Sequence, residues 1–245
     1  MVDAADAVMK KLFPPAVHLA ITLVWFIVAL YMIFLYAPRE QTMGEVQRIF
    51  YIHFPSACTA LLAYGFVFLG SMGYLWKRSR AADDLASASA EVGFIFCCCV
   101  LVTGPLWAKP AWGIWWTWDA RLTSTFILWL LYIAYLMLRS YVINPGRVET
   151  LSAVVGVLGF VDAIIDYMAI RWWRTQHPQP VIGGGAGSGL EPRMWLTVFV
   201  AWGAFLCLFF YLVRQRMALA RLGRELAELR RDVLSQVEIQ QGQAR

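Results

Sequence analysis

The chain has 245 residues, of which 60% are hydrophobic and 15% are charged, and its formal net charge is +5. Soluble domains are about 45–50% apolar and about 25% charged, so this composition excludes an ordinary soluble domain and indicates an integral membrane protein. The positive charge then concerns orientation in the membrane rather than binding to nucleic acid. The five cysteines lie within apolar runs and form no Cys-x-x-Cys pair, which excludes a disulfide framework and favours a packing role.

Six apolar stretches are long enough to cross a membrane, because a helical span needs about 20 residues. They cover residues 16–36, 55–76, 87–107, 122–141, 151–170 and 194–213. The apolar run of the first stretch is too long for a signal peptide, so we expect it to remain as an anchor. The predicted fold is all-α, a polytopic membrane protein with six transmembrane helices. We expect residues 1–213 to form the transmembrane domain and residues 214–245 to form a cytoplasmic amphipathic helical tail.

Six spans place both termini on one side of the membrane. Most of the 21 Lys and Arg residues fall on that side, so the positive-inside rule predicts that both termini are cytoplasmic. The connections after the first, third and fifth spans then share the outer face. They contain His53, the stretch 105–124 and His177, respectively. His18 opens the first span on the opposite side, and we interpret it as a structural or interfacial histidine.

The stretch 105–124 connects the third and fourth spans and is rich in tryptophan. Its tryptophans are Trp107, Trp112, Trp115, Trp116 and Trp118. Pro105, Pro110 and Gly113 are expected to break any helix through it. One interpretation is an aromatic belt at the membrane surface, where tryptophan is enriched. The other is a platform for a large, flat, apolar ligand, because stacking and apolar burial are what indole rings supply. Composition alone leaves both open.

Two imidazoles beside an aromatic platform suit haem iron, because imidazole is a common axial ligand and the porphyrin plane stacks on aromatic rings. The haem propionates need cations, and the predicted outer side offers Arg48, Lys109, Arg121, Arg171 and Arg174. Zinc fits less well, because the chain has no His-Glu-x-x-His motif and the two histidines are far apart in sequence. A structural role for either histidine stays open at this point.

Two aspartates and a glycine-rich stretch carry less information. Asp162 and Asp166 lie four residues apart on one face of the fifth span. Carboxylates at membrane depth usually face a partner or a cavity, and we expect them to pair with cations such as Arg171 or Arg174. The stretch 183–189 lacks the ending of a phosphate loop and is interpreted as a flexible tether.

The tail carries an apolar stripe at alternating spacings of three and four residues. Its members are Leu219, Leu222, Leu226, Leu229 and Val233. This spacing predicts a helix that lies on the membrane or docks against a cytoplasmic partner, and the sequence does not choose between these two.

Four segments resemble a family of haem-handling membrane proteins. Residues 112–124 (WGIWWTWDARLTS) are similar to the tryptophan-rich WWD signature of that superfamily. Within it, the chain resembles CcmC, the haem exporter C family of bacterial cytochrome c maturation. The other segments that agree are 48–55 (RIFYIHFP), 101–104 (LVTG) and 171–178 (RWWRTQHP).

The resemblance implies a multi-pass protein of the bacterial inner (cytoplasmic) membrane that holds haem b in transit at its periplasmic face. It implies that His53 and His177 are the axial ligands of the haem iron. It also implies that the haem is cradled by Trp112, Trp115, Trp116, Trp118 and Asp119.

The resemblance further implies partners. The haem would pass to the chaperone CcmE, whose own histidine captures it covalently. The chain would belong to an ABC transporter complex with the ATPase CcmA, the permease CcmB and the small membrane protein CcmD. We expect a delivery subunit rather than an enzyme, with a lyase-like part in haem attachment as a further hypothesis. Two alternatives are an electron-transfer protein like cytochrome b and a permease subunit without its own haem site.

Overall fold

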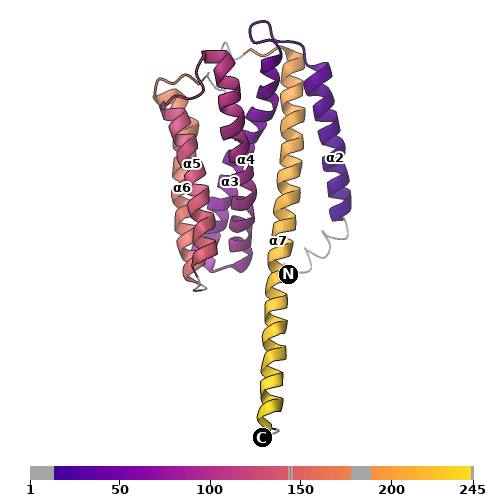
Figure 1. The fold of residues 1–245 in the computed structure, drawn as a ribbon, viewed down its shortest axis with the longest axis vertical. Coiled ribbons are helices and arrows are strands. Elements are labelled where there is room, and N and C mark those ends of the chain that lie inside the picture. Colours follow the sequence, from indigo (N-terminus) through magenta and orange to yellow (C-terminus); the bar gives the residue numbers. More distant parts are fainter. Residues whose placement is uncertain (1–13, 143, 145, 178–188, 244–245) are drawn as a thin grey trace.

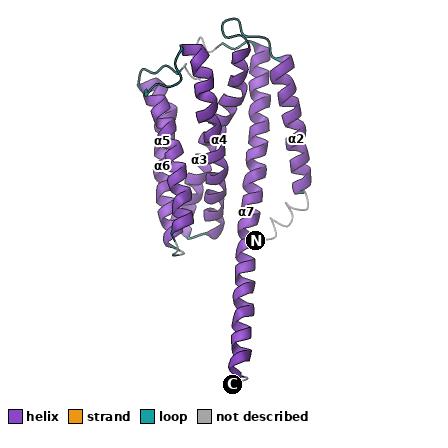
Figure 2. Cartoon of the chain, viewed as in Figure 1, coloured by secondary structure: helices purple, strands orange, loops and turns teal. Residues whose placement is uncertain are grey.

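The computed structural model describes residues 14–142, 144, 146–177 and 189–243, and the regular elements of that part of the chain are helices (Figure 1, Figure 2). They are α2 (Pro15–Tyr31) with its π-helical continuation η1 (Met32–Tyr36), the 3-10 helix η2 (Glu45–Ile49), α3 (Phe50–Lys77), α4 (Arg80–Trp112), α5 (Ala120–Tyr141), α6 (Arg147–Trp172) and α7 (Pro192–Gln243). Six of the helical segments are apolar and long enough to cross a membrane. The predicted all-α, six-span architecture is therefore confirmed.

The connections between the helices gather at two ends of the bundle (Figure 1). Residues 37–44, residues 113–119 and the described part of 173–191 meet at one end, which we call the Trp end. Residues 78–79 and the described part of 142–146 lie at the other end, which we call the tail end, because α7 continues beyond the bundle there. The prediction that the first, third and fifth connections share one face is confirmed.

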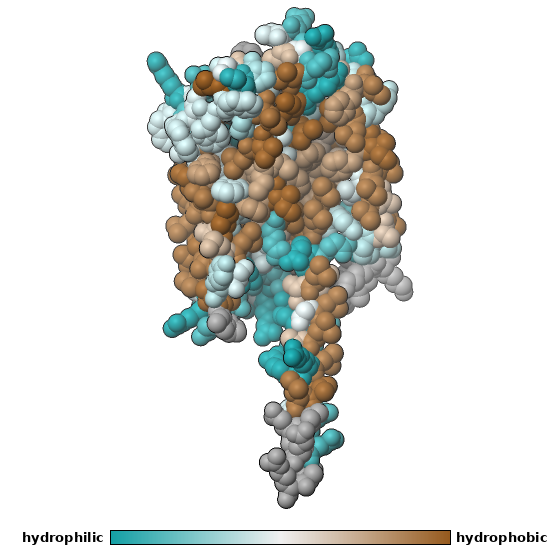
Figure 3. Space-filling model, viewed as in Figure 1, coloured by the Kyte–Doolittle hydropathy of each residue, from teal (hydrophilic) through white to brown (hydrophobic). Residues whose placement is uncertain are grey.

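Helix α7 joins the parts of the bundle. It packs against α2, α3 and α4. Helix α3 also packs against α4 and α6, and α5 packs against the same two helices. Apolar side chains cover the middle of the molecule and polar side chains gather towards the ends (Figure 3). Ile27, Leu69 and Val102 are among the large apolar side chains that are exposed. A continuous apolar surface of this kind is what contact with lipid requires.

The expected boundary at residue 213 falls inside one helix, because α7 runs without a break for 52 residues. Two ion pairs hold the first part of the tail against α4. Arg216 pairs with Glu91 at 2.5 Å, and both terminal nitrogens of Arg224 lie 2.5 Å from the Asp84 carboxylate. Further along, the apolar stripe of the tail is exposed at Leu226 and Leu229.

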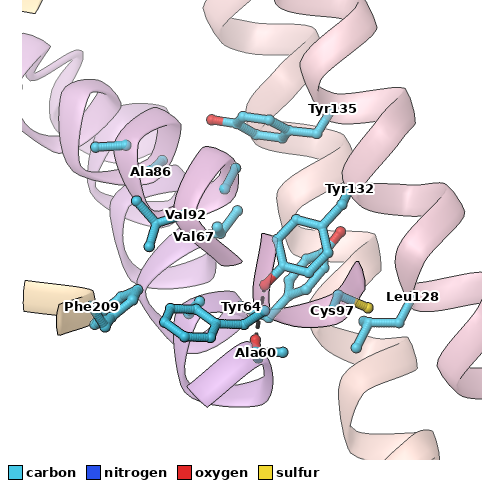
Figure 4. Close-up of a cluster of buried hydrophobic side chains, with 14 of the residues drawn as sticks. Ala60, Tyr64, Val67, Ala86, Val92, Cys97, Leu128, Tyr132, Tyr135 and Phe209 are labelled. Atoms are coloured by element: carbon cyan, nitrogen blue, oxygen red, sulfur yellow. Dashed lines mark hydrogen bonds between the residues drawn. The ribbon is translucent and has the colours of Figure 1, made fainter. Parts of the chain in front are cut away.

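The core of the bundle is built on tyrosines from facing helices (Figure 4). The rings of Tyr64 on α3 and Tyr132 on α5 lie 4.4 Å apart, and the Tyr132 hydroxyl donates a 2.8 Å hydrogen bond to the Ala60 carbonyl. Both side chains are completely buried. Small residues on the neighbouring helices make room for them: a Cβ atom at Gly93 would lie 2.3 Å from the Tyr132 hydroxyl, and one at Gly159 would lie 2.1 Å from the Tyr64 hydroxyl.

We expect the substitution Gly159→Ala to lower the free energy of unfolding by about 1–3 kcal/mol, because the added methyl overpacks a buried ring that has nowhere to move. The midpoint of thermal unfolding in detergent measures this loss. Gly65→Ala is the matched control, since a Cβ atom there meets nothing within 4 Å. Equal midpoints for the two variants would contradict the close packing of α6 on α3.

Candidate functional site

The position of the apolar run predicted that His53 lies in the connection before the second span. The structure instead places His53 in the first turn of α3. The reason is local. The 3-10 helix η2 leads directly into α3, so the helix begins before Pro55 and continues through it. The imidazole is 9% exposed and faces α4. Its Nδ1 lies 2.9 Å from the Thr103 hydroxyl, and its ring centroid lies 5.9 Å from that of Trp107.

The tryptophan-rich stretch is more helical than predicted. Helix α4 continues through Pro105 and Pro110 to Trp112, so the connection shrinks to residues 113–119. Membrane helices tolerate interior prolines because neighbouring groups can satisfy the carbonyls that lose a helical partner. Gly113 ends the helix with a φ of 77°, and its N–H bonds to the Lys109 carbonyl at 3.0 Å. This left-handed conformation costs glycine little.

The indole rings of this region form an open cluster. Trp116 and Trp118 meet edge to face at 5.6 Å, and Trp118 meets Phe126 in the same way at 6.0 Å. Trp118 is 72% exposed. Among the described residues, the buried Nε1 atoms of Trp107 and Trp116 have no hydrogen-bond acceptor. Trp118 therefore presents an exposed aromatic face, and the region also holds two buried donors without an acceptor, which indicate a missing partner.

Asp119 ties this connection to the segment that carries His177. Its Oδ1 accepts the Leu122 N–H at 3.0 Å and so caps α5, while its Oδ2 accepts the Thr117 hydroxyl at 3.1 Å and the Gln176 N–H at 3.0 Å. The N–H of His177 in turn bonds to the Thr175 hydroxyl at 2.8 Å. One carboxylate thus holds two connections that are distant in sequence.

The environment keeps Asp119 ionised. Burial alone would raise the pKa of its carboxyl, but hydrogen bonds from the Leu122 and Gln176 backbone and from the Thr117 and Thr175 side chains hold the pKa below its ordinary value. A carboxylate that accepts several hydrogen bonds is stabilised in its charged form.

The two histidines predicted to share a face lie at the same end of the bundle. His177 is half-buried at the Trp end, and His53 lies at the same end in the first turn of α3. His18 belongs to the first turn of α2, a helix that starts away from the Trp end (Figure 1). Its Nε2 contacts the Cys207 carbonyl at 3.2 Å, and its ring meets Tyr211 edge to face. The structural interpretation of His18 agrees with these contacts.

One of the predicted cations has a buried carboxylate partner. Arg121 pairs with Asp166 at 3.0 Å, and the side chains of the pair are only 13% and 3% exposed. Asp166 therefore pairs with Arg121 and not with Arg171 or Arg174, because α5 and α6 pack side by side here.

The remaining predicted cations lie nearer the surface or at its edge. Arg48 pairs with Glu45 and also donates to the Ile33 carbonyl. Arg171 lies over the Tyr167 ring at 4.9 Å, and Arg174 is exposed. Lys109 donates to the Gly113 carbonyl at 2.8 Å. Positive charge therefore does lie around the Trp end, although Arg48, Lys109, Arg121 and Arg171 also make contacts within the chain.

Several polar residues of this region were not predicted as partners of Asp166 from the sequence. Ser124 and Thr125 both donate to Asp166 Oδ1, at 2.9 Å and 2.7 Å. Their spacing of three and four residues from Arg121, on one face of α5, is the signal that could have found them. In the described part of the chain, the buried Oδ2 of Asp162 has no hydrogen-bond partner. The glycines at 183–187 lie outside the described residues.

Comparison with known proteins identifies relatives along most of the chain. The model of the family described as heme exporter protein C matches residues 3–232. The chain is 35% identical over 173 residues to heme exporter protein C of Bradyrhizobium diazoefficiens, covering 71% of this chain and 66% of that protein. It is 31% identical over 188 residues to heme exporter protein C of Haemophilus influenzae, with 76% of each chain covered. The chain belongs to the heme exporter protein C family.

Proposed function

We propose that the chain binds haem at the Trp end, with His53 and His177 as axial ligands of the iron, and holds it for delivery during cytochrome c maturation. The observation that carries this proposal is that one tryptophan-rich stretch contacts both histidine-bearing segments. The ring of Trp107 lies 5.9 Å from that of His53, and Asp119 accepts a hydrogen bond from the backbone of Gln176, next to His177.

The residues present fit haem as a cargo. Imidazole is a common axial ligand of haem iron. The two histidines would therefore supply the coordination bonds to the iron when haem is bound. The exposed rings of Trp115 and Trp118 offer the porphyrin an apolar face. The unused Nε1 donors of Trp107 and Trp116 suit carboxylate acceptors such as propionates. Arg171 and Arg174 add positive charge near His177.

The proposed setting is the bacterial inner membrane, with the Trp end facing the periplasm and the tail end facing the cytoplasm. The excess of Lys and Arg towards the tail end supports this orientation. The proposed receiver of haem b is the chaperone CcmE, and the proposed complex contains CcmA, CcmB and CcmD. The chain is a delivery subunit in this proposal, and it orients haem while the chaperone supplies the nucleophile.

The visible absorption spectrum of the full-length protein, purified from haem-replete cells, tests the proposal. We expect the Soret and α bands of a bis-imidazole haem, and a haem content at least about tenfold lower in His53→Ala and in His177→Ala. His18→Ala is the matched control, because this histidine contacts α7 far from the Trp end, and its haem content should be unchanged. A colourless wild-type protein, or equal haem loss in all three variants, would overturn the proposal. Reversible redox cycling with a quinone would instead favour an electron-transfer protein.

A further inference from the structure

The hydroxyl of Thr103 lies between two groups that compete for its single proton. Its Oγ1 donates to the Cys99 carbonyl at 2.6 Å and lies 2.9 Å from His53 Nδ1. A carbonyl oxygen can only accept a hydrogen bond, whereas an imidazole nitrogen can donate or accept. A hydroxyl whose proton is directed to a carbonyl can still accept a hydrogen bond through its lone pairs. The short contact with Cys99 therefore leaves Thr103 as the acceptor and His53 Nδ1 as the donor.

We infer that Thr103 is a positioning residue that fixes His53 in the Nδ1-protonated tautomer and so directs the lone pair of Nε2 to the haem iron. The inference rests on the proposed function for the role of Nε2, whereas the tautomer is a property of the protein without haem. Ligating histidines generally donate their other ring N–H to a neighbouring group, which sets the tautomer and the ring orientation. Among the described residues, the structure gives Nε2 of His53 no hydrogen-bond partner.

The packing around the ring supports one orientation. His53 is 9% exposed, and the Trp107 ring lies against it at 5.9 Å. A Cβ atom at Gly104 would lie 3.3 Å from His53 Cε1, which is tighter than an ordinary contact. The pair Thr103–Gly104 therefore provides a hydrogen-bond acceptor at one ring nitrogen and space beside the ring carbon.

Three variants separate this role from simple packing. Thr103→Val removes the hydroxyl and keeps the shape of the side chain, whereas Thr103→Ser keeps the hydroxyl. Thr22→Val is the matched control, because Thr22 is also buried and its hydroxyl also donates to the carbonyl four residues earlier, at 2.8 Å. The thermal unfolding midpoint of each variant in detergent shows that it is folded.

The first measurement uses the full-length protein without haem. The chain has only 3 histidines, so the ring nitrogen-15 shifts in detergent can be assigned with the His53→Ala and His18→Ala variants. We expect Nδ1 to carry the proton in the wild type, Thr103→Ser and Thr22→Val, and this preference to be lost in Thr103→Val. A wild type whose His53 carries its proton on Nε2, or a Thr103→Val variant that keeps the wild-type shifts, would overturn the inference.

The second measurement is haem titration of the same proteins. We expect Thr103→Val to bind haem about 10–100-fold more weakly than the wild type, and Thr103→Ser and Thr22→Val to stay within about threefold of it. Wild-type affinity in Thr103→Val would overturn the positioning role. A wild type that binds no haem would instead overturn the proposed function, and the nitrogen-15 shifts would still decide the tautomer.

Discussion

Replacing Arg121 with alanine is expected to lower the free energy of unfolding by about 3–5 kcal/mol, because it leaves a buried carboxylate without its cation. Asp166 is 3% exposed on its side chain, and Arg121 supplies its only formal positive charge among the ion pairs of the described residues. The hydroxyls of Ser124 and Thr125 would remain on Oδ1, but neutral donors do not replace a guanidinium at this depth. Reversible denaturation in mixed micelles, followed by circular dichroism, measures the loss.

A double-mutant cycle separates the ion pair from packing. Asp166→Asn alone should cost less than Arg121→Ala, because arginine near the helix end can reach water more easily than aspartate can. Arg121→Met combined with Asp166→Leu should recover most of the stability, since an apolar pair of similar volume often replaces a buried ion pair without loss. Arg121→Met and Asp166→Leu are therefore also measured singly, and single losses that simply add up to the loss of the double variant would show that the two side chains do not interact.

Replacing Asp119 is expected to loosen the His177 segment and to weaken haem binding about 10–100-fold, the usual effect of losing a group that orients a ligand. Asp119→Ala also removes the cap of α5, which costs about 1 kcal/mol of stability. Asp119→Asn keeps a capping oxygen for the Leu122 N–H but directs an amide donor at the Gln176 N–H. The asparagine variant therefore tests the tie between the two connections while sparing the helix.

Haem titration and amide hydrogen exchange at Gln176 measure these effects. Exchange at Gln176 should be faster in both variants, while the unfolding midpoint should fall clearly only in Asp119→Ala. If Asp119→Asn bound haem as tightly as the wild type and left exchange at Gln176 unchanged, the tie would have no role in holding the site.

The tie should also depend on pH in a definite direction. The pKa of Asp119 is lower in the folded chain than its ordinary value of 3.8, so the folded state binds this proton less well than the unfolded state does. The ionised Asp119 therefore contributes its full stabilisation at any pH above its ordinary pKa. This stabilisation is lost as the pH falls through the lower pKa of the folded chain. The difference in stability between the wild type and Asp119→Asn should be constant near neutral pH and should shrink only in strong acid.

The sequence predicted the number of spans because lipid tolerates only long apolar helices, and a count of spans alone assigns each connection to an end. That count was enough to bring His53, His177 and the tryptophans to one end of the bundle. The prediction that Pro105 and Pro110 break the helix was wrong, because α4 continues through both. The energetic cost of an interior proline depends on neighbouring groups in space, which a local sequence pattern does not contain.

Partners across helices were the hardest feature to predict. The pair Arg121–Asp166 and the contact between Thr103 and His53 join residues 45 and 50 positions apart. Each depends on how two helices are rotated about their axes, and many rotations bury an equally apolar face. Asp119 could be predicted as part of the tryptophan signature, but its bond to the Gln176 backbone depends on the path of a connection without regular structure.

The unbroken course of α7 has a mechanical consequence. A helix of 52 residues is about 78 Å long, and it starts next to the His177 connection and ends well beyond the opposite face. A tilt of about 5° around its midpoint would carry each end of such a rod through about 3 Å. The ion pairs from Arg216 and Arg224 to α4 lie close to where a pivot would form. A tilt imposed on the tail would therefore displace the first residues of α7 at the opposite side of the membrane.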